Sequence, residues 1–474
     1  MLFSEPVFVF FFLPAVLLAY FSLGEKSRDT VLLASSLIFY AWGEHGYVLV
    51  LVASIFLNWL CGLGAAPGPG KNRSRGSLLV AITGNLLLLI FFKYTNFLVA
   101  NLNVLLLRLH SPLLAVRPIH LPIGISFFAF QGMSYVIDVY RGTVPPQKSL
   151  LKIAMYKSFF PQLIAGPIVR YVDVKPQIER RTIGFDDFAA GIQRFIVGLA
   201  KKMIVANVVA RPTDAIFALP VSQLSASLAW VAVIGYALQI YFDFSAYSDM
   251  AIGLGRMFGF RFLENFNYPY IATSMTEFWR RWHISLSSWF RDYLYIPLGG
   301  NRVSVGRQYA NLMVVFALCG LWHGASWNFV IWGLFHGVFL TLERLAARKQ
   351  ISMPFRSLRH VYVILVVLVS WVFFRAETAA LALSFIGAMV GMTHHGQVMP
   401  GLRVFVDTEV VTVVILGIIG STPVLPAIKR RWERSDWLGQ WREAAGLLGL
   451  MGVFVYCVML MAAGSYSPFI YFRF

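Results

Sequence analysis

Charged side chains are scarce in this 474-residue sequence: they make up 13% of it, whereas hydrophobic residues make up 58%. With a mean hydropathy of +0.68, the chain carries more apolar surface than one water-surrounded core could bury. The scarcity of charge therefore argues against an ordinary soluble domain and indicates that lipid surrounds much of the protein. The two-residue alternation of membrane β-strands is also missing, so we predict membrane-crossing helices.

Cysteine is rare as well. Only Cys61, Cys319 and Cys457 occur, each in apolar sequence and without CxxC spacing. This distribution argues against a disulfide framework and against a zinc site. We expect three buried thiols and no bound metal.

Negative charge is in short supply, with 22 acidic against 40 basic residues and a net charge of +18. A basic protein could bind nucleic acid, but these residues lie in short loops between apolar runs. That is the distribution expected of loops on the inner side of a membrane. We interpret the charge as a determinant of topology and as contacts with anionic lipids, and we expect no nucleic-acid partner.

Apolar runs recur along the whole chain, and about 20 residues are enough to cross the hydrocarbon core of a bilayer as a helix. Polar or Gly/Pro-containing segments separate them. We predict spans near residues 7–22, 31–42, 48–63, 78–99 and 121–140, helices at 183–210 and 228–254, and later spans at 361–374, 410–424 and 445–461.

The distribution of basic residues predicts the topology. The first run has no basic residue before it and is followed by Lys26 and Arg28, which indicates an uncleaved first span with its N-terminus outside. Basic segments at 71–75 and 429–431 are expected on the inner side. One predicted span, 445–461, follows the basic segment at 429–431, so residues 464–474 are expected on the outer side of the membrane.

The middle of the chain departs from this simple pattern. Pro161, Gly166 and Pro167 interrupt an apolar run, and irregular backbone at membrane depth is tolerated only where protein or a water-filled cavity surrounds it. We therefore predict a re-entrant segment at 159–170. Residues 255–307 hold seven arginines against three acidic residues and are expected to be cytoplasmic and partly embedded.

His323 is the first candidate for chemistry. Residues 308–342 contain no Asp, Glu, Lys or Arg, and the stretch Gly320–Ser326 predicts a break between two helices. An ionisable side chain inside a span is costly and indicates function. A buried imidazole with a lowered pKa would suit removal of a hydroxyl proton. The alternative is a neutral histidine bonded to a backbone carbonyl.

Other histidines and a cysteine give weaker signals. His283 lies among Trp, Arg and Tyr residues, where an interfacial belt of aromatics and arginines is the simpler interpretation. We interpret His336 as packing. Cys319 would share a helix face with His323 and could form a nucleophile pair, but Gly320 and Gly324 make an unbroken helix doubtful and argue against the pair.

Two carboxylates and the terminal segment complete the candidates. Asp243 and Asp249 could line a polar cavity or a proton path, or could bond the arginines that follow them. The aromatic segment Phe469–Phe474 could be an interface anchor. It could instead present Tyr471 as an acyl acceptor.

An ordered set of motifs carries a resemblance to a known family. The motifs are LPIGISFFAFQ at 121–131, YVIDVYR at 135–141, FPQLIAGP at 160–167, FDFSAYSD at 242–249, WHISLSSW at 282–289 and LWHG at 321–324. Together they resemble the bacterial membrane-bound O-acyltransferases, in particular the alginate O-acetyltransferase group. A lone Trp–His pair would be weak evidence, but the ordered set is specific.

The resemblance implies an all-α, polytopic membrane fold with about eleven transmembrane helices, plus re-entrant and interfacial helices, around a funnel. The whole of residues 1–474 would be one domain, with a catalytic core at roughly 121–345 and an acyl-carrier tail at 464–474. His323 would be the central catalytic histidine, and His283 would line the same tunnel. Tyr471 would carry the acyl group, as in the related teichoic-acid system.

The resemblance also implies the reaction partners. Acetyl-CoA would be the cytoplasmic donor, with no permanently bound cofactor, and the arginines Arg280, Arg281 and Arg291 would suit its phosphates. The enzyme would lie in the bacterial inner membrane with both termini periplasmic, and would pass acetyl groups to a periplasmic hydrolase-like transferase. Alginate is the expected acceptor, with cellulose and peptidoglycan as alternatives.

Two other functions compete with this one. A proton-coupled transporter or flippase would use His323 and the carboxylates for proton coupling, but no inverted repeat is visible. A lipid O-acyltransferase would keep the chemistry and change the acceptor. The outward-facing tyrosine segment disfavours that reading.

Overall fold

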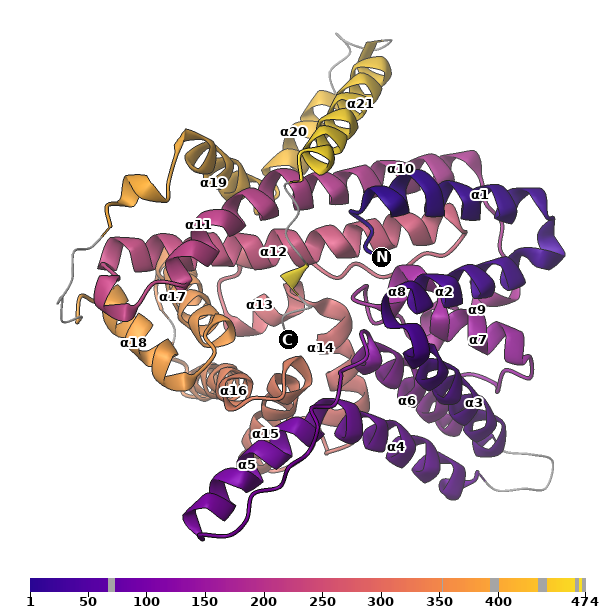
Figure 1. The fold of residues 1–474 in the computed structure, drawn as a ribbon, viewed down its shortest axis with the longest axis horizontal. Helices are drawn as coiled ribbons and strands as arrows, with labels where there is room; N and C mark the ends of the chain where they lie inside the picture. Colours follow the sequence, from indigo (N-terminus) through magenta and orange to yellow (C-terminus); the bar gives the residue numbers. More distant parts are fainter. Residues whose placement is uncertain (67–72, 352, 393–399, 434–440, 465–468, 471–474) are drawn as a thin grey trace. The chain divides into compact units, whose positions relative to one another are not determined.

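The computed structural model describes residues 1–474 except 67–72, 352, 393–399, 434–440, 465–468 and 471–474. Over the described residues the chain is helical and forms no strand (Figure 1), which confirms the predicted all-α class. Backbone contacts group the chain into two compact units. The first comprises Met1–Ile192 and Ala251–Leu263, and the second Gln193–Met250 and Glu264–Phe474.

The first unit contains most of the N-terminal spans. Its helices are α1 (Leu13–Ser22, preceded by a π-helical turn at Phe8–Phe12), α2 (Arg28–Glu44), α3 (Val48–Ala65), α4 (Arg75–Leu89), α5 (Thr95–Arg108), α6 (Ile125–Arg141), α7 (Leu150–Ser158), α8 (Phe160–Leu163) and α9 (Tyr171–Glu179). The predicted runs at 7–22, 31–42, 48–63 and 121–140 correspond to helices here. The run at 78–99 is longer than predicted, because a π-helical turn at Ile90–Tyr94 joins α4 to α5.

The irregular segment predicted at 159–170 is confirmed as buried, non-helical backbone after the short α8. The Tyr156 hydroxyl donates to the carbonyl of Val169 over 2.9 Å. A Cβ at Gly166 would lie 2.7 Å from the carbonyl oxygen of Pro161, so only glycine allows the chain to fold back this tightly. The backbone groups freed by the missing helix therefore find partners inside the protein.

The second unit holds the longer C-terminal helices. They are α11 (Asn207–Phe217), α13 (Met275–Arg281), α14 (Ile284–Phe290), α15 (Val305–His323), α16 (Trp327–Arg348), α17 (Arg356–Arg375), α18 (Ala379–Met389), α19 (Thr408–Gly420), α20 (Val424–Glu433) and α21 (Trp441–Ala462). The chain passes between the units within α10 (Phe185–Ala200) and α12 (Ala226–Met257). Sequence patterning missed α18, which is only 11 residues long.

The hairpin of α15 and α16 confirms the predicted helix break. α15 ends at His323 and α16 begins at Trp327. A Cβ at Gly320 would lie 2.0 Å from the carbonyl oxygen of Phe329, and one at Gly333 would lie 2.1 Å from that of Phe316. The two helices thus approach backbone to backbone, and this close contact fixes where the last residue of α15 lies.

Several of these helices can cross a membrane. Six stretches of the described chain are long and apolar enough: Glu25–Ala65, Arg75–Arg108, Ala226–Met257, Trp327–Arg348, Arg356–Arg375 and Glu443–Ala462. Shorter apolar helices occur at Phe8–Ser22, Ala379–Met389 and Thr408–Gly420. The protein is therefore a multi-pass membrane protein, and the number of about eleven crossings stays a prediction.

Candidate active site

His323 occupies the last position of α15 and is 4% exposed. Its ring packs edge-on against three aromatic rings, with centroid distances of 5.0 Å to Trp322, 5.1 Å to Trp332 and 5.3 Å to Phe374. It lines a narrow cavity of about 10 Å³, barely the space of one water molecule. The aromatic walls keep the imidazole in a dry environment.

His283 lies between α13 and α14 and is fully buried. Its backbone adopts the left-handed conformation, with φ of 44°, which is uncommon for a residue with a side chain. The backbone carbonyl of Asn265 accepts a hydrogen bond from the Ile284 N–H over 2.9 Å and holds this turn. Its imidazole centroid lies 6.4 Å from that of His323, so the fold brings the two predicted histidines together.

Asn265 also fixes the tautomer of His283. The side-chain oxygen of Asn265 accepts from the backbone N–H of Ser285 over 3.2 Å, a group that can only donate, so this atom must be the amide oxygen. His283 Nδ1, 3.1 Å from the same oxygen, therefore carries the proton. The lone pair then lies on Nε2, which is buried and has no hydrogen-bond partner in the described part of the chain.

Burial lowers the pKa of His283 to about 3, so the imidazole is neutral at physiological pH. A neutral ring with its lone pair on Nε2 can accept a proton or a hydrogen bond from a reacting group. Asn265 was not predicted, because in the sequence it is one of two asparagines, with Asn267, among the aromatic residues of 260–270. A residue that orients another side chain is rarely recognised without the fold.

Replacing Asn265 by aspartate should make the reaction sensitive to acid. A carboxylate next to Nδ1 favours the imidazolium and raises the pKa of His283 from its low wild-type value. The Nε2 lone pair is then lost as the pH falls through the raised pKa. We expect the acid limb of the pH–rate profile to move to higher pH, measured as the turnover rate at matched protein levels. Ser285→Ala removes a neighbouring hydrogen bond without adding charge and should not move that limb.

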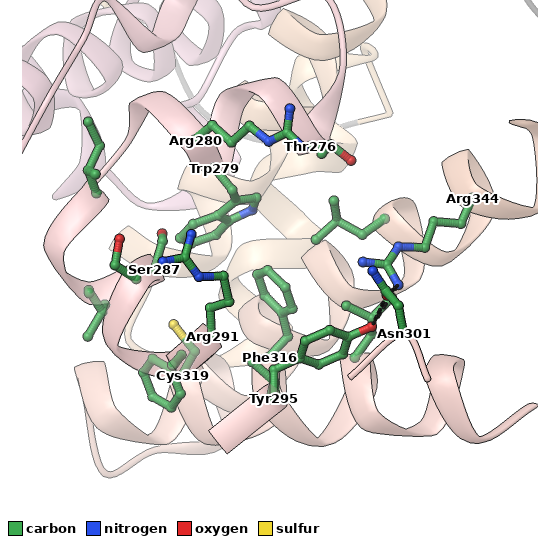
Figure 2. Close-up of a pocket in the computed structure, with 17 residues that line it drawn as sticks. Thr276, Trp279, Arg280, Ser287, Arg291, Tyr295, Asn301, Phe316, Cys319 and Arg344 are labelled. Atoms are coloured by element: carbon green, nitrogen blue, oxygen red, sulfur yellow. Dashed lines mark hydrogen bonds between the residues drawn. The ribbon is translucent and has the colours of Figure 1, made fainter. Parts of the chain in front are cut away.

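A second, larger cavity of about 400 Å³ lies in the same unit, and neither histidine is among its lining residues. Three arginines line it, Arg280, Arg291 and Arg344, and Figure 2 shows them around the apolar rings of Trp279 and Phe316. The basic groups suit phosphate and the rings suit an apolar ligand portion. The cavity therefore fits an elongated anionic molecule with an apolar portion.

The arginines differ in how they are held. The guanidinium of Arg280 makes no ion pair or hydrogen bond with any described residue, and that of Arg344 donates to the Tyr295 hydroxyl over 2.9 Å. Arg281, the third predicted donor-binding residue, does not line the cavity. Its guanidinium bonds Glu277 at 2.9–3.0 Å and the carbonyl of Asn267 at 3.0 Å.

The large cavity reaches the residues beside both histidines. Ile284, which follows His283 in the chain, lines it, and so does Cys319, four residues before His323. Sequence analysis doubted a continuous helix through Gly320, and that doubt was wrong: α15 runs unbroken from Val305 to His323. Gly320 allows the close contact between α15 and α16. Cys319 lines the large cavity.

The two intramembrane carboxylates form ion pairs with basic residues that precede them. Asp249 lies 2.6 Å from both Arg194 and Lys201. Asp243 lies 2.6 Å from Lys202, and both of these side chains are at least 95% buried. Sequence analysis considered the arginines that follow as partners, and the structure instead pairs these carboxylates with the earlier residues of α10 and the turn after it.

Asp243 also holds the C-terminal segment. Its Oδ2 accepts a hydrogen bond from the backbone N–H of Ile470 over 2.6 Å. The ring of Phe469 stacks on Tyr247 at 4.8 Å, and Ile470 lines the narrow cavity together with His323. Tyr471, the predicted acyl carrier, lies outside the described residues.

His336 packs as predicted among aromatic rings, 4.9 Å from Trp332 and 5.1 Å from Trp279. It is fully buried, and neither ring nitrogen has a hydrogen-bond partner among the described residues. Each unsatisfied buried nitrogen costs about 1–3 kcal/mol. This side chain therefore contributes shape to the core at some expense of stability.

A multi-pass helical protein with two buried histidines beside an arginine-lined cavity has the architecture of a membrane-embedded transferase. Residues 125–386 match the membrane-bound O-acyltransferase family, and the chain belongs to that family.

The similar proteins are all named as enzymes that transfer an acyl group. The chain is 40% identical to the probable alginate O-acetylase of Pseudomonas putida over 495 residues, covering 100% of both chains. It is 38% identical to the peptidoglycan O-acetyltransferase of Helicobacter pylori, over 83% of this chain and 80% of that one. The teichoic acid D-alanyltransferase of Bacillus subtilis is 29% identical, over 53% and 67% respectively. The protein is a membrane-bound O-acyltransferase, and the relatives support acetyl transfer.

Proposed function

We propose that this enzyme takes acetyl groups from cytoplasmic acetyl-CoA and passes them across the inner membrane, through Tyr471, for O-acetylation of an exopolysaccharide. One observation carries the relay: Ile470 and His323 line the same narrow cavity. Tyr471 follows Ile470 directly in the sequence. A tyrosine hydroxyl at that sequence position is a suitable acceptor.

The chemistry requires a base. A tyrosine hydroxyl, with a pKa of about 10 in water, is mostly protonated near neutral pH. In the proposed step His323 takes this proton, and the phenolate oxygen attacks the thioester carbonyl of acetyl-CoA. The C–S bond breaks, the acetyl group stays on the tyrosine oxygen, and the thiolate leaves as coenzyme A after taking up the proton. His283, with its free Nε2, can hold a polar group of the reactants in place.

The large cavity is the proposed donor site. Its three guanidinium groups can bind the phosphates of coenzyme A, since arginine matches phosphate oxygens with paired N–H donors. Trp279 and Phe316 offer apolar contacts to the remaining part. The thioester would then point toward Cys319 and Ile284, the lining residues nearest in sequence to the two histidines.

Arg280 provides a direct test of this donor site. Arg280→Gln should raise the KM for acetyl-CoA roughly tenfold, because one charge-assisted hydrogen bond to phosphate is lost, with kcat nearly unchanged. Arg281→Gln is the matched control: it removes the same charge from the adjacent residue, whose guanidinium is bonded to Glu277 instead of facing the cavity. Equal KM values in the two variants would contradict the assignment.

The proposed acceptor polymer is alginate, because the full-length relatives include probable alginate O-acetylases. Final transfer to the polymer would need a separate periplasmic hydrolase-like transferase. A peptidoglycan substrate is the alternative that the Helicobacter pylori relative supports. Acetyl analysis of both polymers after deletion of the gene would distinguish the two.

The relay itself can be tested with purified protein. Incubation with isotope-labelled acetyl-CoA, followed by digestion and mass spectrometry, should find the label on Tyr471. Label on a different residue, or none on a protein that still acetylates its polymer, would refute the tyrosine relay. The family assignment and acyl-transfer activity would stand in either case.

A further inference from the structure

A third cavity, of about 350 Å³, lies within the first unit, and it shares no lining residue with the two cavities of the candidate active site. It is bounded by the end of α9, the start of α10 and the turn that follows α12. Its lining is unusually basic, with four arginines against one carboxylate: Arg180, Arg181, Arg256, Arg261 and Asp187. The residue types of a cavity indicate what it can bind, and this set suits an anion.

Two of these arginines are already paired inside the protein. Arg181 forms an ion pair with Asp29 and lies over the ring of Phe260 at 4.7 Å. Arg261 donates through Nη2 to both carboxylate oxygens of Asp187, at 3.2 and 2.9 Å. Asp187, the one carboxylate in the lining, is therefore paired with Arg261, and these contacts hold Arg181 and Arg261 in place.

The positive charges of the other two arginines, Arg180 and Arg256, have no acidic partner among the described residues. The guanidinium group of neither Arg180 nor Arg256 makes an ion pair or a hydrogen bond with any residue that the structure describes. Two like charges that face one cavity repel each other. A bound anion would relieve that repulsion, and a phosphate group matches the fork of donors that each guanidinium presents.

The position of the cavity favours a lipid over a soluble anion. Arg256 lies in the last turn of α12, and Ala226–Met257 is one of the candidate membrane spans. The end of a span lies at the level of the lipid headgroups. The cavity is therefore placed where anionic phosphates are concentrated.

Exposed apolar side chains flank the same place. Phe185, two residues before Asp187, is 84% exposed, and Leu263, two residues after Arg261, is 47% exposed. The end of α1 is tied to this region, because the Tyr20 hydroxyl donates to the carbonyl of Phe258. These apolar surfaces can contact acyl chains while the arginines contact the headgroup.

We propose that this cavity binds the phosphate of an anionic phospholipid headgroup, with Arg180 and Arg256 as its ligands. The site is distinct from the acyl-transfer centre and does not depend on the proposed relay. Its function is to seat one lipid against α9, α10 and the end of α12.

Native mass spectrometry of the full-length protein can test the proposal. The protein would be titrated with phosphatidylglycerol, with phosphatidylcholine and with inorganic phosphate. We expect one phosphatidylglycerol molecule to bind preferentially, and the double variant Arg180→Gln/Arg256→Gln to bind it at least tenfold more weakly. The matched control is Arg108→Gln/Arg117→Gln, which removes the same charge from two exposed arginines outside the cavity.

Each outcome decides the matter. Weaker lipid binding in the cavity variant alone supports the site. Equal losses in the two double variants would show that only overall charge matters and would overturn it. Binding of inorganic phosphate that displaces the lipid at equal concentration would overturn the lipid as the ligand, and no preference for phosphatidylglycerol over phosphatidylcholine would do the same.

Discussion

Replacing His323 with alanine should reduce acetyl transfer by roughly 10²–10⁴-fold. The imidazole lies at the end of α15, 4% exposed, in a cavity barely large enough for one water molecule. No described Asp, Glu or Lys side chain lines this cavity to replace the lost base. The measurement is acetate released from the polymer by alkali, normalised to the amount of enzyme in the membrane fraction.

His336→Leu is the control for this experiment. His336 is equally buried, yet both of its ring nitrogens lack hydrogen-bond partners in the described structure. An apolar side chain of similar size removes that penalty, so the variant should keep its activity and its thermal stability. If His323→Ala retained normal activity, or if both variants lost it alike, His323 would not be the base.

Tyr471→Phe should abolish the outward transfer of acetyl groups while leaving the amount of enzyme unchanged. Phenylalanine keeps the aromatic ring and removes only the hydroxyl, which separates a carrier from a packing residue. In the purified variant, labelled acetyl-CoA should leave no label on the terminal peptide. Full polymer acetylation in cells that carry the variant would return the segment to the role of an interface anchor.

The hydrogen bond between Asp243 and the Ile470 N–H allows a second test of this prediction. Asp243→Ala removes the acceptor of the Ile470 N–H, so labelling of Tyr471 should fall even in folded protein. Asp249→Ala also breaks ion pairs, with Arg194 and Lys201, and Asp249 makes no hydrogen bond with the described terminal residues Phe469 and Ile470. At matched thermal stability, a larger loss of label in the Asp243 variant supports positioning by that carboxylate. Equal losses would indicate a general structural effect.

Much of the helical framework could be predicted from the sequence, because apolar runs and basic loops act locally. The helix break at Gly320–Ser326 is an example, and α15 and α16 confirm it. Helix ends were less predictable. The π-helical turn at Ile90–Tyr94 extends a predicted span, and nothing in an unbroken apolar run marks such a turn.

Some residues of the candidate site could be predicted from the sequence, and others could not. His323 was predictable because a titratable group in an uncharged stretch is conspicuous. Asn265 was not, since its role depends on contacts with His283 and Ser285 almost 20 residues away. Arg344 joins Arg280 only because α16 returns past α13, and the sequence alone carries no sign of that proximity.

The narrowness of the cavity at His323 has a consequence for the cell. About 10 Å³ of space gives no room for a file of water molecules, and protons and ions cross membranes along such files. The proposed relay across the bilayer would therefore open no water-filled path for ions at this point. The same dryness limits water as a rival nucleophile, which in the proposed reaction would favour transfer from the thioester to the acceptor over hydrolysis.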